Sequence, residues 1–246
     1  MVRRNSGVLS AARARGGFTL VELLVVIIII AILAAIAVPA VMRATATART
    51  ARIKTEIDML HMAIQQYKNE YGSYPPAVDV DTAGNPGRIN KHIQRLFPRT
   101  PGGPSGCLLD SNNASYMKPN TALVGWLVGY SDDPTNPMAI KPGSGGGIPL
   151  PGVTKKKLFD FDSSRVSGGQ FTAPNKPGSP YIYIDSASYP ISGLPATVEI
   201  DPKTTKPFNP DSFQIISAGR DEKYGNDDDL SNFWPSTRKD YLDSLK

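Results

Sequence analysis

Glu22 is the most unusual chemical feature of the sequence, because it is a single carboxylate at the edge of a long apolar segment. The twenty residues 23–42 carry no formal charge. About 20 apolar residues allow a helix to cross a bilayer core of about 30 Å. A carboxylate beside such a segment is costly to remove from water, so we interpret Glu22 as functional. The alternative is a carboxylate in the lipid headgroup layer without a partner.

A second acidic feature lies near the end of the chain, in SAGRDEKYGNDDDLSNFW (217–234). Four aspartates fall within nine residues of it: Asp221, Asp227, Asp228 and Asp229. We expect them to be ionised at neutral pH and to repel one another unless water or a cation lies between them. Oxygen ligands of this kind suit Ca²⁺. An EF-hand is excluded by the spacing, and an ordinary solvated acidic turn remains the alternative.

The usual catalytic motifs are absent from the sequence. There is no Gly-x-Ser-x-Gly or His-Glu-x-x-His, and the glycine run 143–147 lacks the Lys-Ser/Thr of a phosphate loop. His61 and His92 have no cysteine partners at metal spacing, so we expect surface or partly packed histidines. Asp132-Asp133 is typical of a turn. The sequence therefore predicts a protein that is not an enzyme.

The net charge of +5 is concentrated at the N-terminus. Residues 1–17 hold four arginines and no acidic residue, so 5 − 4 leaves +1 for the rest. Positive charge before an apolar span marks the cytoplasmic end of a membrane segment. We expect no nucleic-acid binding, and we expect Lys155–Lys157 to lie in a solvated loop. Cys107 is the only cysteine, which excludes an internal disulfide.

The small-residue pair Gly16-Gly17 precedes the apolar segment, whereas a secretory signal has its cleavage site after that segment. Cleavage after Gly17 would therefore leave the hydrophobic helix in the mature protein. An uncleaved signal anchor is the alternative that hydropathy alone leaves open.

The stretch GGFTLVELLVVIIIIAILAAIAVP resembles the N-terminal motif of type IV pilins and type II secretion pseudopilins. The resemblance implies that a prepilin peptidase removes the leader 1–17 after Gly17 and methylates the new amine of Phe18. It also implies a filament subunit, delivered by an inner-membrane assembly platform. The leader would be cytoplasmic, and the head would be periplasmic or extracellular.

The resemblance gives Glu22 a role. Cleavage would create an amine on Phe18, four residues before Glu22, and residues i and i+4 share a helix face. The carboxylate could pair with this amine or with that of a neighbouring subunit, and so set the register of assembly.

The acidic stretch 217–234 resembles the C-terminal calcium loop of major pseudopilins. Carried over, Asp221, Asp227 and Asp229 are ligand candidates, with Asp228 adjacent and backbone carbonyls completing the shell. The sequence departs from that pattern at Glu222, where a glycine is common, and in its much longer head.

These features need a scaffold, for which we predict an α+β fold. A membrane or filament-core helix at 18–42 continues into an amphipathic helix at 43–72, with a kink or local melting at Pro39 and a stop at Gly72. The head (73–246) is predicted to be a small antiparallel sheet on the apolar helix face, with a loop-rich insertion at 79–180. The expected strands are 122–130, 181–185, 197–200 and 213–217.

The combined interpretation is a pseudopilin of a type II secretion-like system. A type IV pilus pilin for adhesion, DNA uptake or motility is the first alternative. The second is a membrane-anchored binding protein that uses a pilin-like anchor.

Overall fold

The computed structural model describes residues 18–80, 87–99, 118–138, 155–174, 178–191 and 197–246. It divides into two compact units, Met1–Ala46 and Thr47–Lys246, and we call the second the head unit. Four features of the sequence lie outside the described residues: the leader with Gly17, Cys107, the glycine run 143–147 and part of the insertion 79–180.

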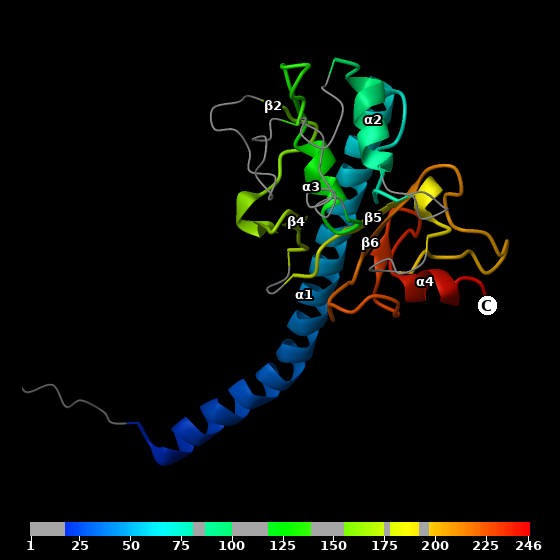
Figure 1. The fold of residues 1–246 in the computed structure, drawn as a ribbon. Helices are drawn as coiled ribbons and strands as arrows, with labels where there is room; N and C mark the ends of the chain where they lie inside the picture. The colour runs from blue at the N-terminus through cyan, green and yellow to red at the C-terminus, as the bar shows by residue number, and fades with distance from the viewer. Residues whose placement is uncertain (1–17, 81–86, 100–117, 139–154, 175–177, 192–196) are drawn as a thin grey trace, which may run out of the picture. The chain divides into compact units, whose positions relative to one another are not determined.

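Helix α1 (Leu20–Tyr71) is 52 residues long and is drawn in blue to cyan in Figure 1. By length and composition it could cross a membrane, and its large apolar side chains from Leu20 to Met42 are exposed. Pro39 lies inside the helix. Local melting at Pro39 is therefore not observed, and the kink stays a prediction.

The part of α1 within the head unit buries one face. The buried residues are Ile53, Ile57, Leu60, Ala63, Ile64 and Tyr67. Their spacing of three and four residues matches the helical repeat and confirms the predicted amphipathic helix. The helix ends at Tyr71, where Gly72 has φ 79° and donates its N–H to the Lys68 carbonyl at 2.7 Å. Glycine adopts this left-handed conformation without strain, which explains the predicted stop.

A three-stranded antiparallel sheet packs on this helix face, in the order β5 (Ile182–Asp185), β6 (Phe213–Ser217), β7 (Leu230–Ser231). Ile182 pairs with Ile216, and Ser217 pairs with Leu230. Tyr183, Phe213 and Ile215 join the core that contains α1, as Figure 1 shows for β5 and β6 beside the helix. The predicted α+β fold, with strands at 181–185 and 213–217, is confirmed.

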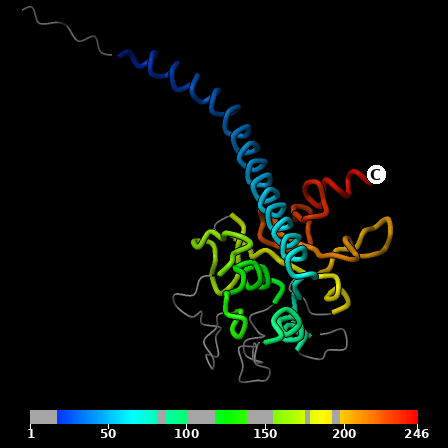
Figure 2. The backbone as a smooth tube through the Cα atoms, turned by 90° about the horizontal axis from the view of Figure 1, so that it is seen from above, coloured from blue at the N-terminus to red at the C-terminus, as the bar shows by residue number. Residues whose placement is uncertain are grey.

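Smaller elements complete the head unit. They are α2 (Arg88–Leu96), α3 (Ala122–Leu127), β1 (Tyr130–Ser131), β2 (Lys155–Lys156), the 3-10 turn η2 (Ser163–Arg165), β3 (Val166–Ser167), β4 (Gln170–Phe171), the 3-10 turn η3 (Ser186–Ser188) and α4 (Arg238–Asp243). In both views, 118–138 and 155–174 lie on one side of the head part of α1 and 197–246 on the other (Figures 1 and 2).

Three predictions about the head were wrong. The segment 122–130 is mostly the helix α3, which buries Leu123, Trp126 and Leu127 in the core, and Trp126 donates to the Pro76 carbonyl at 2.9 Å. The segment 197–200 is not a strand, because only Ile200 forms a β-type pair, an isolated bridge with Pro207. Lys155 and Lys156 form β2 rather than a solvated loop, and the Lys155 ammonium donates to the Met138 carbonyl.

Candidate functional site

The start of α1 is a reciprocal capping box between Thr19 and Glu22. Thr19 donates to Glu22 Oε2 from its backbone nitrogen at 2.7 Å and from its hydroxyl at 2.8 Å. In return, the Glu22 nitrogen donates to Thr19 Oγ1 at 3.2 Å. These bonds occupy N–H groups that have no partner within the helix. The Glu22 carboxylate is therefore held against the first turn.

This geometry corrects one part of the sequence analysis. The helix begins at Leu20, so Phe18 precedes it and does not share a helix face with Glu22. The Thr-x-x-Glu pattern is a known sequence signature of a helix start, and it could have revealed the capping box. Gly17 lies outside the described residues, and the pairing of Glu22 with a free Phe18 amine stays a prediction.

The segment that follows presents an uncovered apolar surface. Phe18 is 88% exposed, and Leu20, Ile36 and Met42 are each more than half exposed. Apolar surface of this extent marks a site of contact with lipid or with other protein chains.

The acidic loop connects β6 to β7 and is closed by its own carboxylates. Asp228 Oδ2 accepts from the nitrogens of Arg220 and Asp221 at 2.7 and 3.2 Å. Asp229 Oδ2 accepts from the nitrogens of Gly225 and Asn226 at 2.6 and 3.3 Å. Each carboxylate therefore meets two N–H dipoles, which offset the repulsion between the aspartates.

Asp221 is held in a similar way, whereas Asp227 is exposed. The Lys223 nitrogen and the Asn226 side-chain amide donate to the two oxygens of Asp221 at 2.9 and 2.7 Å. Within the described parts of the chain, no three His, Cys, Asp or Glu side chains gather as a group that could hold a metal ion. Among these described residues the four aspartates therefore do not converge on one point, and calcium binding by the loop stays a prediction.

Asp229 differs from the other three because it is fully buried. Its Oδ1 has no hydrogen-bond partner. Burial raises the pKa of Asp229 to about 7, although the N–H groups of Gly225 and Asn226 act in the opposite direction. The expectation that all four aspartates are fully ionised at neutral pH is therefore wrong for Asp229.

Two backbone positions fix the course of this loop. Gly219 has φ 63°, and a Cβ there would lie 2.2 Å from the Asp228 carbonyl oxygen. Glu222 has φ 64°, a left-handed conformation that costs an L-residue about 1–2 kcal/mol. The sequence therefore has glutamate at position 222, where the left-handed backbone conformation favours glycine.

Residues 12–38 match the family model described as the prokaryotic N-terminal methylation motif. No curated protein and no solved structure matches the chain. The match covers the segment with Gly17, Phe18 and Glu22 and ends before the head unit begins.

The chain thus carries a prepilin-type signal of the kind found in type IV pilins and pseudopilins. With the apolar helix, this signal fits a single-pass protein anchored in the inner membrane, processed by prepilin peptidase and able to assemble into filaments. Subunits of this class are typically structural rather than enzymatic.

Proposed function

We propose that this protein is a pseudopilin, a structural subunit of a type II secretion-like pseudopilus. The observation that carries the proposal is the position of the prepilin-type signal, directly before an exposed apolar helix whose second part belongs to the core of the head unit. Such a chain can insert in a membrane, leave it with other subunits and carry its head outside.

The capping box supports a role for Glu22 in this cycle. Removal of residues 1–17 would free the amine of Phe18, next to the Thr19 nitrogen that already donates to Glu22 Oε2. The carboxylate is therefore held close to the place where the amine would form. In a filament, Glu22 would pair with the Phe18 amine of a neighbouring subunit, because an unpaired buried charge is strongly unfavourable.

The leader would lie in the cytoplasm and the head in the periplasm or at the cell surface. The partners would be prepilin peptidase, an inner-membrane assembly platform and further copies of the chain. A type IV pilus pilin and a membrane-anchored binding protein remain the alternatives. The single cysteine favours the pseudopilin, because many pilins close their C-terminal region with a disulfide.

Calcium is part of the proposal as a structural ion of the 217–234 loop. The buried Asp229 Oδ1 without a partner supports it, since a bound cation would compensate the charge of this carboxylate. Asp221 and Asp227 are the other candidate ligands, and both are exposed. Asp228 is the adjacent candidate, and its Oδ2, like Asp229 Oδ2, accepts two backbone bonds.

Mass analysis of the native protein tests the function. We expect a chain that begins at an N-methylated Phe18 and that is recovered in sheared filaments. Recovery of only the full-length chain, or of a chain cut after Met42, would contradict the proposal. Filaments that depend on an outer-membrane secretin would distinguish a pseudopilus from a type IV pilus made for surface adhesion.

A further inference from the structure

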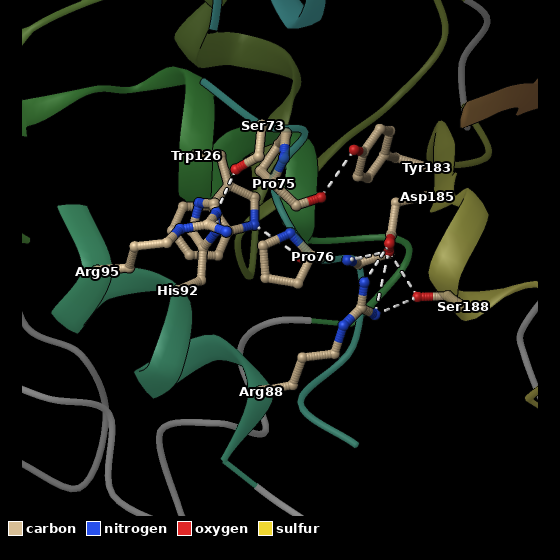
Figure 3. A network of polar contacts seen from close by, with 11 residues as sticks. Ser73, Pro75, Pro76, Arg88, His92, Arg95, Trp126, Tyr183, Asp185 and Ser188 are labelled. Atoms are coloured by element: carbon tan, nitrogen blue, oxygen red, sulfur yellow. Dashed lines mark hydrogen bonds and ion pairs between the residues drawn. The ribbon is translucent and has the colours of Figure 1, made fainter. Parts of the chain in front are cut away.

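A cavity of about 440 Å³ lies in the head unit, and none of its lining residues belongs to the acidic loop. Its walls come from α2, from the segment that follows α1 and from η3. The polar side chains that line it include Ser73, Arg88, Lys91, Arg95, Asp185 and Ser186. Figure 3 shows most of this region, with Arg88 extending from α2 toward Asp185 and Arg95 extending from α2 toward Ser73.

The sequence of α2 explains why cations gather here. Arg88, Lys91 and Arg95 recur after three and four residues and therefore share one face of the helix. Ile89 and Ile93 are buried on the other side and anchor the helix in the core. The helix RINKHIQRL contains no acidic residue, so its own side chains do not neutralise this face.

One of the three cations is already neutralised. Arg88 forms a forked ion pair with Asp185, and its Nη1 also donates to Ser188 Oγ at 2.7 Å. Asp185 additionally accepts from the Ala77 nitrogen at 2.7 Å. Among the described residues that line the cavity, Asp185 is the only acidic one. Its charge is matched by Arg88, so it does not compensate a second cation.

Neither of the other two cations has an acidic partner among the residues that the structure describes. Lys91 Nζ has no hydrogen bond or ion pair with any residue that the structure describes. Arg95 Nη2 donates to Ser73 Oγ and lies 3.1 Å from His92 Nδ1, both uncharged groups. Burial and the neighbouring Arg95 and Arg88 lower the pKa of His92 to about 4, so this imidazole is neutral at pH 7.

Hydroxyl groups add donors to the same cavity. Ser73 Oγ accepts from Arg95, which leaves its own hydrogen available to donate. Ser186 also lines the cavity. Lys91 and Arg95 are like charges at i and i+4, an arrangement that destabilises a helix unless an anion lies between them.

We propose that this cavity binds the phosphate group of a small molecule. A phosphate dianion matches the two uncompensated cations in charge, and it can accept bonds from a guanidinium, an ammonium and the hydroxyls together. The volume lies in the range of small-ligand sites and is too small for a folded partner. This site goes beyond the proposed filament function and does not depend on it.

Calorimetric titration of the full-length chain in neutral detergent, at fixed ionic strength, tests the site. The probes are inorganic phosphate, glucose 6-phosphate and succinate. We expect one phosphate-type ligand per chain, bound at least tenfold more tightly than succinate. If glucose 6-phosphate binds more tightly than inorganic phosphate, the ligand of the cavity is a phosphate ester. If the two bind equally, the cavity recognises the phosphate group alone.

The variants identify the residues that bind. Lys91→Gln and Arg95→Gln should each weaken phosphate binding at least tenfold. Lys203→Gln removes the same charge from an exposed loop that does not line the cavity, and it should change affinity less than twofold. The melting temperature of each variant checks its folding, and Lys91→Gln removes no hydrogen bond or ion pair with a described residue. Undetectable phosphate binding, equal binding of succinate, or equal losses in all three variants would overturn the proposal.

Discussion

Glu56 on α1 and Arg165 at the end of η2 form an ion pair in which each side chain is only 13% exposed. The second carboxylate oxygen of Glu56 accepts a hydrogen bond from Tyr181 Oη at 2.5 Å. The Arg165 guanidinium also lies over the Phe171 ring, 4.3 Å from its centroid. The Glu56 carboxylate of α1 thus binds both Arg165 of η2 and Tyr181, the residue that precedes β5.

Glu56→Gln should destabilise the head unit by about 3 kcal/mol, because it removes the buried counter-charge of Arg165 and leaves only the more exposed Asp162, whose Oδ2 lies 3.8 Å from Arg165 Nε. Urea unfolding of the full-length chain in detergent would measure the loss. Glu70→Gln is the matched control, since Glu70 pairs with a Lys156 side chain that is 65% exposed, and it should cost less than about 1 kcal/mol. Equal losses would contradict a special role for the Glu56 pair.

Glu22→Ala should leave membrane insertion and the fold of the head intact but impair filament assembly, and Glu22→Asp should be partly defective. Thr19→Ala separates the two roles of Glu22, because it removes the hydroxyl from the capping box and retains the carboxylate. It should weaken the helix start by about 1 kcal/mol and still allow assembly. Filament yield is the measurement. A Thr19→Ala defect as large as that of Glu22→Ala would show that capping, rather than pairing with an amine, is what assembly requires.

Calcium should raise the melting temperature of the full-length chain relative to chelator. Binding to the folded state alone adds about 2.7 kcal/mol when calcium is 100-fold above its Kd. Magnesium should substitute poorly, because it prefers a smaller octahedral shell. Asp229→Asn should remove most of the difference, whereas Asp132→Asn, in an exposed turn, should retain it. Identical melting in calcium and chelator would leave the loop as a hydrogen-bonded turn.

His92 should make the head less stable in acid. Its pKa is about 4 in the folded protein and about 6.5 when unfolded, so the unfolded state binds more protons between these values. The stability contributed by the neutral imidazole is therefore complete above about pH 6.5 and is lost as pH falls toward 4. The slope from this group is at most about 1.4 kcal/mol per pH unit. Urea unfolding at several pH values should show a shallower acid slope in His92→Gln, and identical slopes would contradict the buried neutral histidine.

The sequence predicted those parts of the fold in which each residue's neighbours follow from a regular repeat. The spacing from Ile53 to Tyr67 identified the buried face of α1, and Gly72 identified its end. The short strands at 182–185 and 213–217 were found because β-branched and aromatic residues are bounded by turn residues. The prepilin-type signal was found because its residues are contiguous.

The remaining features depend on contacts between distant residues. The run 122–127 is too short for periodicity to distinguish strand from helix, and contact with Pro76 accompanies the helix. Helix α2 was missed because the N–H groups at its start are bound by Asp79, eight to ten residues earlier. The roles of Asp228 and Asp229 follow from where the backbone N–H groups of the loop point, which composition does not specify.

The shared core of α1 and the sheet also has a consequence for folding during translation, because its two parts are synthesised at different times. Ile57 lies on the helix face that packs in one core with Phe213 and Ile215, which are synthesised more than 150 residues later. At the usual pace of translation, that face stays uncovered for on the order of ten seconds. The nascent chain therefore exposes this apolar helix face until strand β6, which covers it, has been synthesised.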